Sequence, residues 1–233
     1  MNVLDVACGS GEPAISIAAQ LNGTGSVIGV DISTEPLTVA RQRAAQRKLT
    51  NAFFQQADVQ HLPFVDASFD RVTCRLGVMF FPDVAGALGE IHRVLRPGGR
   101  FAAAAWGPLA QPYFENTVGV VHRMLPELEI PAGALSMFRF GDPARLKSEL
   151  SSADFVNAQA GLRTVPWNWE GTPGELWEYF QGVTVPFASL LNAIPMKLKP
   201  DIDHEVEAVL SRSYEGGAVR LEAQFSLATA IKP

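Results

Sequence analysis

The chain has 233 residues, of which 47% are hydrophobic and 18% are charged, and its net charge is −5. This composition is typical of a globular protein with a sizeable core. Lys and Arg are scattered among acidic residues, which argues against a nucleic-acid partner. No basic leader precedes an apolar run, and no apolar run approaches bilayer length. We therefore expect a cytoplasmic protein without a membrane partner.

The two cysteines, Cys8 and Cys74, each lie in or beside an apolar, strand-like run. Neither has the spacing of a zinc site or of a redox pair. We predict that both are buried thiols in a reducing compartment and that the protein holds no metal.

Strand-like apolar runs alternate with helical patterns over the first hundred residues. In chain order, these segments are 3–7, 13–21, 27–31, 35–48, 52–56, 69–74, 84–95 and 101–105. Runs such as 27–30 are continuously apolar, which is typical of strands buried on both faces. The alternation predicts an α/β fold with a doubly wound, mostly parallel sheet.

The regular alternation stops after Trp106, where prolines break the chain into shorter pieces. The expected elements there are a helix at 143–150, a strand at 158–165, helices at 173–191 and 203–213, and a strand at 221–230. We predict one domain over 1–233. Its cofactor-binding core is 1–106, and 107–233 holds insertions (111–139 and 170–217) and a C-terminal hairpin.

A glycine turn, Gly9-Ser10-Gly11, lies between the first predicted strand and helix. Glycine lets the backbone turn sharply and lets a ligand lie against it, although a tight turn also favours glycine for steric reasons alone. Asp31 ends the second strand, where a carboxylate can accept hydrogen bonds from both hydroxyls of a ribose. Its alternative role is a helix N-cap, although Ser33 can fill that position. This pattern fits NAD as well as S-adenosylmethionine.

Asp5 lies inside the first strand, four residues before Gly9. A carboxylate aimed at the glycine turn disfavours a pyrophosphate. It suits the ammonium and sulfonium charges of S-adenosylmethionine.

An ordered set of motifs then resembles the class I S-adenosylmethionine-dependent methyltransferases, most closely the small-molecule type of ubiquinone and menaquinone biosynthesis. The matching segments are Val3 to Gly11, Val27 to Ser33, Gln56 to Phe64, Ser68 to Arg75 and Leu95 to Arg100. The resemblance implies a seven-stranded sheet whose last two strands form an antiparallel hairpin, with a helical substrate cover. It also implies S-adenosylmethionine as the cofactor and methyl transfer as the activity.

The resemblance also implies a set of cofactor contacts. They are assigned to Asp5, Ala7, Gly9, Gly11, Asp31, Ile32, Asp58, Val59 and Arg75. In this assignment Ala7, Gly9 and Gly11 line the methionine part, and Asp5 orients its ammonium. Asp31 holds the ribose, and Ile32 packs on the adenine. Asp58 accepts from the adenine amine, the Val59 backbone meets a ring nitrogen, and the stretch Arg75-Leu76-Gly77 passes beneath the cofactor. Simpler roles are also open: Ile32 as core, Asp58 as a turn former and Arg75 as a surface ion-pair partner.

Met79 and Phe80 follow the fourth predicted strand, and Trp106 follows the fifth. Ligands bind outside the carboxyl ends of such strands, so we assign these residues to an apolar or aromatic acceptor, with core packing as the alternative. No catalytic residue is assigned, because methyl transfer does not require a base. Of the histidines, His92 is expected to be solvated, and His122 to have a structural role.

Two other functions fit part of the pattern: a nicotinamide-dependent oxidoreductase and a non-catalytic module that binds S-adenosylmethionine. The segment around Asp58 and the turn at 95–99 count against the oxidoreductase. Related enzymes carry helices ahead of the first motif, whereas here only Met1 and Asn2 precede the first strand. This departure from the family pattern is compatible with a truncated gene product that lacks the cover, and the sequence does not decide the point. The oligomeric state is not predicted.

Overall fold

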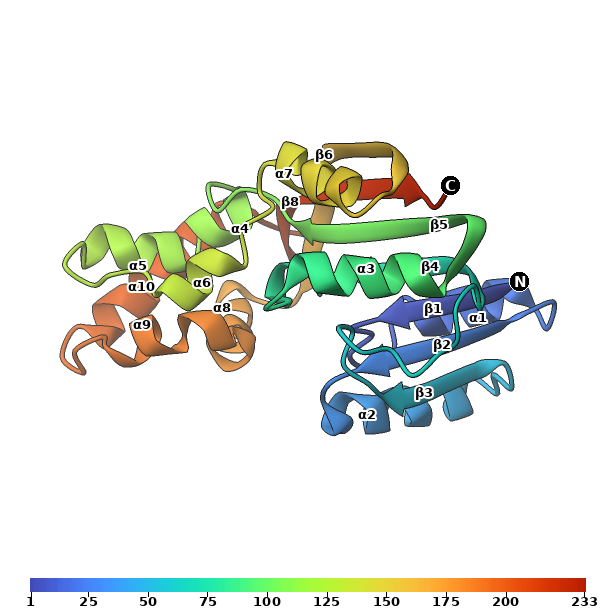
Figure 1. The fold of residues 1–233 in the computed structure, drawn as a ribbon. Coiled ribbons are helices and arrows are strands. Elements are labelled where there is room, and N and C mark those ends of the chain that lie inside the picture. Colours follow the sequence, from blue (N-terminus) through green and yellow to red (C-terminus); the bar gives the residue numbers. More distant parts are fainter. The chain divides into compact units, whose positions relative to one another are not determined.

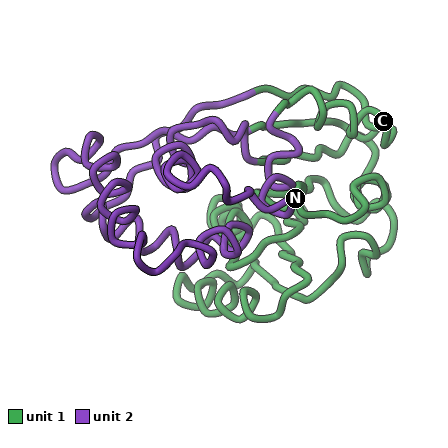
Figure 2. Tube along the Cα trace, turned by 90° about the vertical axis from the view of Figure 1, so that its left-hand side faces the viewer, with its two compact units in different colours: residues 1–105, 142–161, 226–233 green, residues 106–141, 162–225 purple.

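The computed structural model describes residues 1–233, which form two compact units (Figure 2). Unit 1 comprises 1–105, 142–161 and 226–233, and unit 2 comprises 106–141 and 162–225. The first boundary falls next to Trp106, where the sequence predicts that regular alternation ends. The single-domain organisation stays a prediction, as does the role of 107–233 as a substrate cover.

Unit 1 has alternating strands and helices. Its elements are β1 (Asn2–Val6), α1 (Ala14–Leu21), β2 (Ser26–Asp31), α2 (Thr34–Gln46), β3 (Ala52–Gln56), β4 (Phe69–Arg75), η1 (Val78–Phe80), α3 (Val84–Val94), β5 (Leu95–Trp106) and α7 (Pro143–Ser152). Two longer strands, β6 (Val156–Glu170) and β8 (Ala218–Ile231), contribute residues to both units.

The strands follow the order β3-β2-β1-β4-β5-β8-β6, which can be traced upward from β3 in Figure 1. Pairing is parallel between β1 and β2, β1 and β4, β2 and β3, and β4 and β5. The predicted doubly wound, mostly parallel sheet is confirmed. The seven strands along this path match the expected number, and the two-residue strand β7 (Tyr214–Glu215) pairs with β8 as an eighth.

The sheet is buried because its strands are apolar on both faces. Leu4, Val6, Val27 and Val72 have no exposed surface. Small residues of α1, such as Ala18, pack against these strands and let the helix approach closely. The predicted burial of Cys8 and Cys74 is confirmed, and burial raises the pKa of both thiols.

Unit 2 is mainly helical. It contains α4 (Pro112–Glu115), α5 (Val118–Met124), α6 (Ala132–Ser136), α8 (Pro173–Val183), η2 (Val185–Phe187), α9 (Ala188–Asn192) and α10 (Lys199–Ser211). The single helix expected at 173–191 is wrong in detail, because it breaks near Pro186, a residue that cannot donate a helical hydrogen bond. The helix expected at 203–213 begins earlier, at Lys199, with Pro200 in its first turn.

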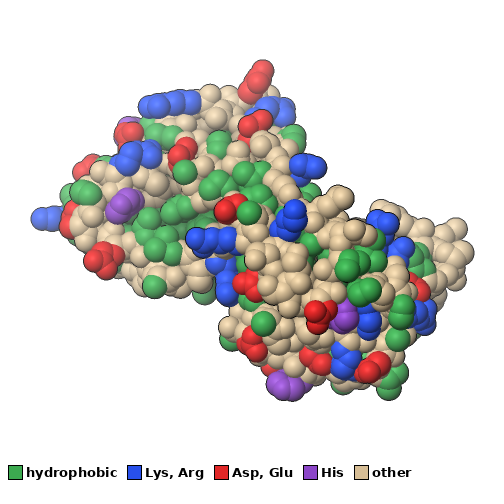
Figure 3. All heavy atoms as spheres, turned by 45° about the horizontal axis from the view of Figure 1, so that its top comes forward, with side chains coloured by type: hydrophobic (Ala, Val, Ile, Leu, Met, Phe, Trp, Pro, Cys, Tyr) green, Lys and Arg blue, Asp and Glu red, His purple; other side chains and the backbone are tan.

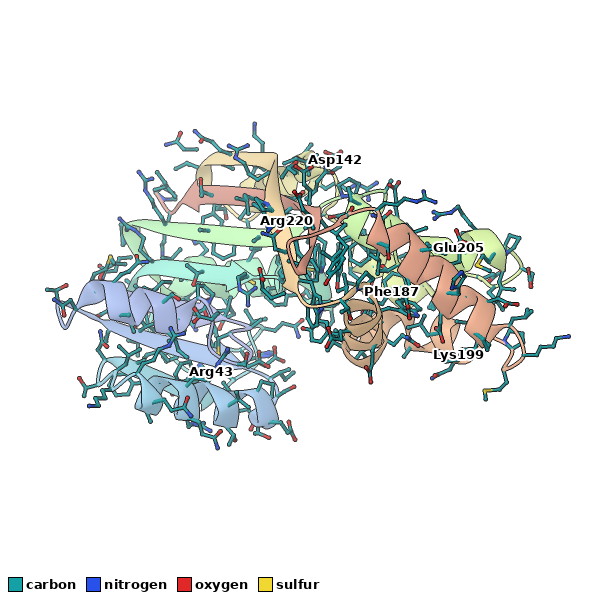
Figure 4. The ribbon with its side chains drawn as sticks, turned by 180° about the vertical axis from the view of Figure 1, so that it is seen from behind. Arg43, Asp142, Phe187, Lys199, Glu205 and Arg220 are labelled. Atoms are coloured by element: carbon teal, nitrogen blue, oxygen red, sulfur yellow. The ribbon has the colours of Figure 1, made fainter.

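Helices α8 and α10 are joined by a polar contact inside unit 2. Trp177 Nε1 donates to Asp203 Oδ1 at 2.7 Å, and Lys199 Nζ lies 3.2 Å from the same oxygen. Lys199, which is labelled in Figure 4, also donates to Gln181 at 2.8 Å. One carboxylate and one amide therefore fix the register of the two helices.

None of the helices combines the length and the apolar character needed to cross a membrane.

Basic side chains lie among acidic ones on the face shown in Figure 3. This distribution agrees with the scattered charges of the sequence. The absence of a nucleic-acid partner stays a prediction.

Arg93, on α3, holds the loop that follows β3. Its guanidinium donates to the carbonyls of Leu62 (3.0 Å) and Phe64 (2.7 Å) and to the carboxylates of Glu90 (2.7 Å) and Asp66 (2.8 Å). Hydrogen bonds with Glu90 and Asp66 raise the pKa of Arg93. The loop is thus tied to a helix whose inner face is buried.

We predict that Arg93→Met lowers the free energy of unfolding by about 1.5–3 kcal/mol, because the loop loses charge-assisted donors. Urea unfolding measures the change. The control is Arg47→Met, which removes an ion pair of 3.5 Å between exposed or half-exposed groups. That pair is expected to contribute no more than about 1 kcal/mol. Equal losses in the two variants would contradict the role given to Arg93.

Candidate cofactor and acceptor site

A cavity of about 380 Å³ lies where strands β1 to β4 end, and all of its walls belong to unit 1. It is lined by Ala7, Val30, Asp31, Ile32, Ala57, Asp58, Val59, Gln60, Leu76, Gly77, Phe80, Phe81 and Pro82. Ligands of open α/β sheets bind at this edge. The cavity brings together predicted residues from the segments after β1, β2, β3 and β4.

The glycine turn is shaped by backbone that favours glycine. Gly9 has φ of +51° and Gly11 has φ of +103°. A Cβ on Gly9 would meet no atom within 4 Å, so only its backbone conformation requires glycine. A Cβ on Gly11 would lie 3.1 Å from Ala40 Cβ, so Gly11 also lets α1 and α2 approach. Arg43 of α2 (Figure 4) donates to the Ser10 carbonyl at 3.2 Å and holds the turn from outside.

Asp31 lines the cavity and also fixes the glycine turn. Its Oδ2 accepts from the Gly9 amide at 2.8 Å, and its Oδ1 accepts from the Ser33 amide at 3.0 Å. Each carboxylate oxygen keeps capacity for a second donor. Ser33 occupies the N-cap position of α2 without a side-chain capping bond. Asp31 is thus a cavity-wall acid held by two backbone donors.

Asp58 is the second acid in the cavity wall. Its Oδ1 accepts from the Gln60 amide at 2.9 Å, which makes a tight turn after β3. Ile32, which follows Asp31 and also lines the cavity, is 66% exposed. An apolar side chain this exposed next to a carboxylate is suited to cover a flat, polar-edged ring.

Phe80, Phe81 and Pro82 give the cavity an apolar side. Phe80 is 51% exposed, whereas Met79 is only 1% exposed and lies in the core. The 3-10 turn η1 sends these two neighbours in different directions. Of the three residues assigned to the acceptor, Met79, Phe80 and Trp106, only Phe80 lines the cavity.

Asp5 is fully buried and does not line the cavity. Thr73 Oγ1 donates to its Oδ1 at 2.6 Å, and the Ala14 amide donates to its Oδ2 at 3.1 Å. Burial raises the pKa of Asp5 from its ordinary value of 3.8 to about 7, against the lowering effect of both hydrogen bonds. The side chain joins β1, β4 and the start of α1. Its contact with a cofactor ammonium stays a prediction.

Arg75 is exposed and its Nε donates to the Glu12 carbonyl at 3.2 Å. It lines a separate groove of about 260 Å³ together with Pro13 and residues of β5 and β8. Gly9 and Gly11 also lie outside the cavity lining, although Ala7 belongs to it. The roles of these residues at a cofactor stay predictions.

Trp106 belongs to unit 2, where it is part of an aromatic cluster. Its ring centroid lies 4.8 Å from Phe225, 5.1 Å from Phe114 and 5.8 Å from Tyr113. These contacts give Trp106 a packing role within unit 2, and its contact with an acceptor stays a prediction.

The expectation that His92 is solvated is wrong. Its Nε2 is buried without a hydrogen-bond partner, and its ring makes an edge contact with Phe155 at 5.1 Å. Burial lowers the pKa of His92, with a smaller contribution from Lys232. The structural role expected for His122 agrees with its Nδ1, which lies 3.2 Å from the Leu128 carbonyl.

Several lining residues were not identified from the sequence as ligand contacts. They are Val30, Ala57, Gln60 and Pro82. Each of them lies one or two positions along the chain from a residue that the sequence did identify. Their position near the end of a strand was therefore the sequence feature that could have found them.

The family described as "Methyltransferase domain" matches residues 1–125 of this chain, which is more than half of it. The protein belongs to this methyltransferase family. The recognition of a class I S-adenosylmethionine-dependent methyltransferase is therefore confirmed.

Two curated relatives are named demethylmenaquinone methyltransferase. The protein of Staphylococcus aureus is 31% identical over 169 residues, which cover 68% of this methyltransferase and 69% of the relative. The protein of Lactiplantibacillus plantarum is 37% identical over 132 residues, which cover 53% of this chain. The second match spans only 56% of the relative's length.

Two solved structures share the fold of this methyltransferase. The YcgJ protein of Bacillus subtilis has a TM-score of 0.62 at 23% identity. The match covers 99% of this chain and 91% of the YcgJ chain. A putative methyltransferase of Bacillus halodurans has a TM-score of 0.61 at 20% identity. This match covers 100% of this chain and 92% of the Bacillus halodurans chain.

We predict that Asp5→Asn changes how the stability of this methyltransferase depends on pH. Between pH 3.8 and about 7 the Asp5 carboxyl ionises in the unfolded chain but stays protonated in the folded one. The folded state then binds more protons, so the free energy of unfolding falls as pH rises through this window. Asn is neutral, and it can accept from Ala14 while donating to the Thr73 hydroxyl. The stability of the variant relative to wild type should therefore rise from pH 4.5 to 7 in urea unfolding. A constant difference over this range would contradict the prediction.

Proposed function

We propose that the protein transfers a methyl group from S-adenosylmethionine to a small apolar or aromatic acceptor. The observation that carries the proposal is a single cavity with two acids on its walls, Asp31 and Asp58, and an apolar side at 80–82. The acids follow adjacent parallel strands, β2 and β3. Two carboxylates at the ends of neighbouring strands suit a nucleoside, which offers ribose hydroxyls at one point and an amine at another.

The residues present fit the cofactor. Asp31 would accept from the ribose hydroxyls, with its orientation fixed by Gly9 and Ser33. Asp58 would accept from the adenine amine, the Val59 backbone would meet a ring nitrogen, and Ile32 would cover one face of the ring. The open space at the Gly9 Cα lets a ligand approach the backbone closely.

When bound, S-adenosylmethionine supplies a methyl group on a sulfonium: the acceptor's electron pair forms the new bond as the carbon–sulfur bond breaks. S-adenosylhomocysteine leaves, and the methylated acceptor gives up its proton to solvent. The chain's own task is to align the acceptor and to exclude water. Phe80 and Pro82 provide apolar surface for this purpose, and no base is assigned.

The relatives named demethylmenaquinone methyltransferase support a quinone-like acceptor. Burial of an aromatic ring against apolar walls contributes about 25 cal/mol per Å² without any charged anchor. Demethylmenaquinone with a short isoprenoid tail is therefore the first acceptor to test.

The proposal predicts that S-adenosylhomocysteine binds and that Asp31→Ala weakens its binding by about 1.5–3 kcal/mol, because the ribose loses a charged acceptor. Isothermal titration calorimetry measures both, with NAD as the competing ligand. Glu205→Ala removes an exposed carboxylate on α10 (Figure 4) and is the control. Measurable binding of NAD with none of S-adenosylhomocysteine would overturn the proposal.

A second prediction concerns the acceptor side. Phe80→Ala should cost about 1–2 kcal/mol in kcat/KM for the acceptor, because apolar contact area is lost. Its effect on S-adenosylhomocysteine affinity should be smaller. Phe53→Ala is a matched control, since Phe53 is 54% exposed and lies outside the cavity lining. Equal kinetics in the two variants would show that the acceptor does not contact Phe80. Trp106→Ala is a poorer variant because it also removes ring packing within unit 2.

A further inference from the structure

Gln60 connects the two sides of the cavity through its side chain. Its Nε2 lies 3.5 Å from Asp58 Oδ2, and its Oε1 accepts from the Asp83 amide at 3.2 Å. Asp58 is on the acidic wall, whereas Asp83 directly follows the apolar segment 80–82. Gln60 itself lines the cavity between them.

The far end of this connection is rigid. Asp83 is the N-cap of α3, and its Oδ1 accepts from the Gly86 amide at 2.9 Å. A helix whose inner face includes Leu88 and Ile91, both without exposed surface, anchors the cap. The Gln60 amide group is therefore held at one end by a fixed helix terminus and faces a carboxylate at the other.

The turn after β3 does not need this side chain. The backbone amide of residue 60 already donates to Asp58 Oδ1 at 2.9 Å, and any residue other than proline can make that bond. The second carboxylate oxygen has only the Gln60 side chain as a donor among the interactions of the structure. Without it, rotation about the last torsion of Asp58 is restrained by a single hydrogen bond.

We infer that Gln60 is a positioning residue that orients the Asp58 carboxylate toward the adenine amine. This inference rests on the proposed function and extends it to a residue that does not itself need to contact the base. A carboxylate whose plane is set in advance loses less freedom when it accepts from the amine, and the two Gln60 donors, at 2.9 Å and 3.5 Å, contact both of its oxygens. The geometry also ties recognition of the adenine to the placement of the acceptor-side segment 80–82 through Asp83.

The test uses Gln60→Met, which keeps the length of the side chain and the backbone bond but removes both side-chain hydrogen bonds. Two ligands separate the roles: S-adenosylhomocysteine and S-inosylhomocysteine, whose base has an oxo group in place of the amine. The variant should bind S-adenosylhomocysteine about three- to tenfold more weakly, the effect of about one net hydrogen bond. Its affinity for S-inosylhomocysteine should stay within twofold of wild type.

A double-mutant cycle with Asp58→Ala completes the test. If Gln60 acts through Asp58, adding Gln60→Met to Asp58→Ala should cause no further loss of affinity. Gln46→Met makes the same substitution at an exposed position of α2 and should leave both affinities unchanged. Calorimetry measures all affinities, and thermal unfolding verifies that each variant is folded.

Three outcomes would overturn the inference. Equal losses for the two ligands would mean that Gln60→Met only loosens the loop. Unchanged affinity for S-adenosylhomocysteine in Gln60→Met, together with a loss in Asp58→Ala, would leave the proposed function standing and remove the role of Gln60. A wild-type protein that binds neither ligand would refute the proposed function and this inference with it.

Discussion

The hydrogen bond from the Gly9 amide to Asp31 Oδ2, at 2.8 Å, is the contact on which the site depends. After β1 the chain passes through two residues with positive φ, Ala7 and Gly9. This turn directs the Gly9 amide toward Asp31 at the end of β2, which accepts its hydrogen bond. The neighbouring bond from the Cys8 amide to the Val30 carbonyl, at 2.9 Å, extends the pairing of β1 and β2 into the turn. Because the acceptor is a carboxylate, the bond is charge-assisted and stronger than one between neutral groups. The same carboxylate also lines the cavity, so the group that fixes the glycine turn is part of the cavity wall.

Asp5 lies near the same turn and has a different physical role. It has no exposed surface, and burial keeps the pKa of Asp5 high enough for the neutral acid to persist at moderately acidic pH. A neutral carboxyl held by Thr73 and Ala14 can join two strands and a helix without the cost of a buried charge. Asp31 reaches the cavity surface, where water or a ligand can solvate the charge. The difference in burial separates an acid held inside the core from one on the cavity wall, although the sequence places both beside the same glycine turn.

Local patterns were enough to predict the central sheet and part of the site. A continuous apolar run identified β2, the alternation of strand-like and helical segments identified β1 and β4, and the position of an acid at a strand end identified Asp31 as a cavity residue. The direction of side chains in irregular segments was harder to predict from the sequence. In η1, Phe80 points outward and Met79 inward, and no periodicity of the sequence distinguishes the two. The contact between Gln60 and Asp83 joins loops 23 residues apart, and it depends on how β3 and α3 pack. Likewise, His92 looked solvated because it lies beside charged residues, whereas packing against Phe155 buries its Nε2.

The charges on the cavity wall bear on which nucleotide-like ligand it accepts. The ionisable side chains in its lining are Asp31 and Asp58, and the lining contains no Lys, Arg or His. A pyrophosphate placed here would meet negative charge without a cationic side chain to offset it, and only backbone amides could compensate. S-adenosylmethionine carries a sulfonium and an ammonium against a single carboxylate, so its net charge is positive and an acidic wall attracts it. The apolar segment at 80–82 adds no cation either, which favours an uncharged acceptor over one that carries a phosphate. The acidic side chains and the apolar segment of the lining thus both agree with the proposed pair of ligands, S-adenosylmethionine and an uncharged acceptor.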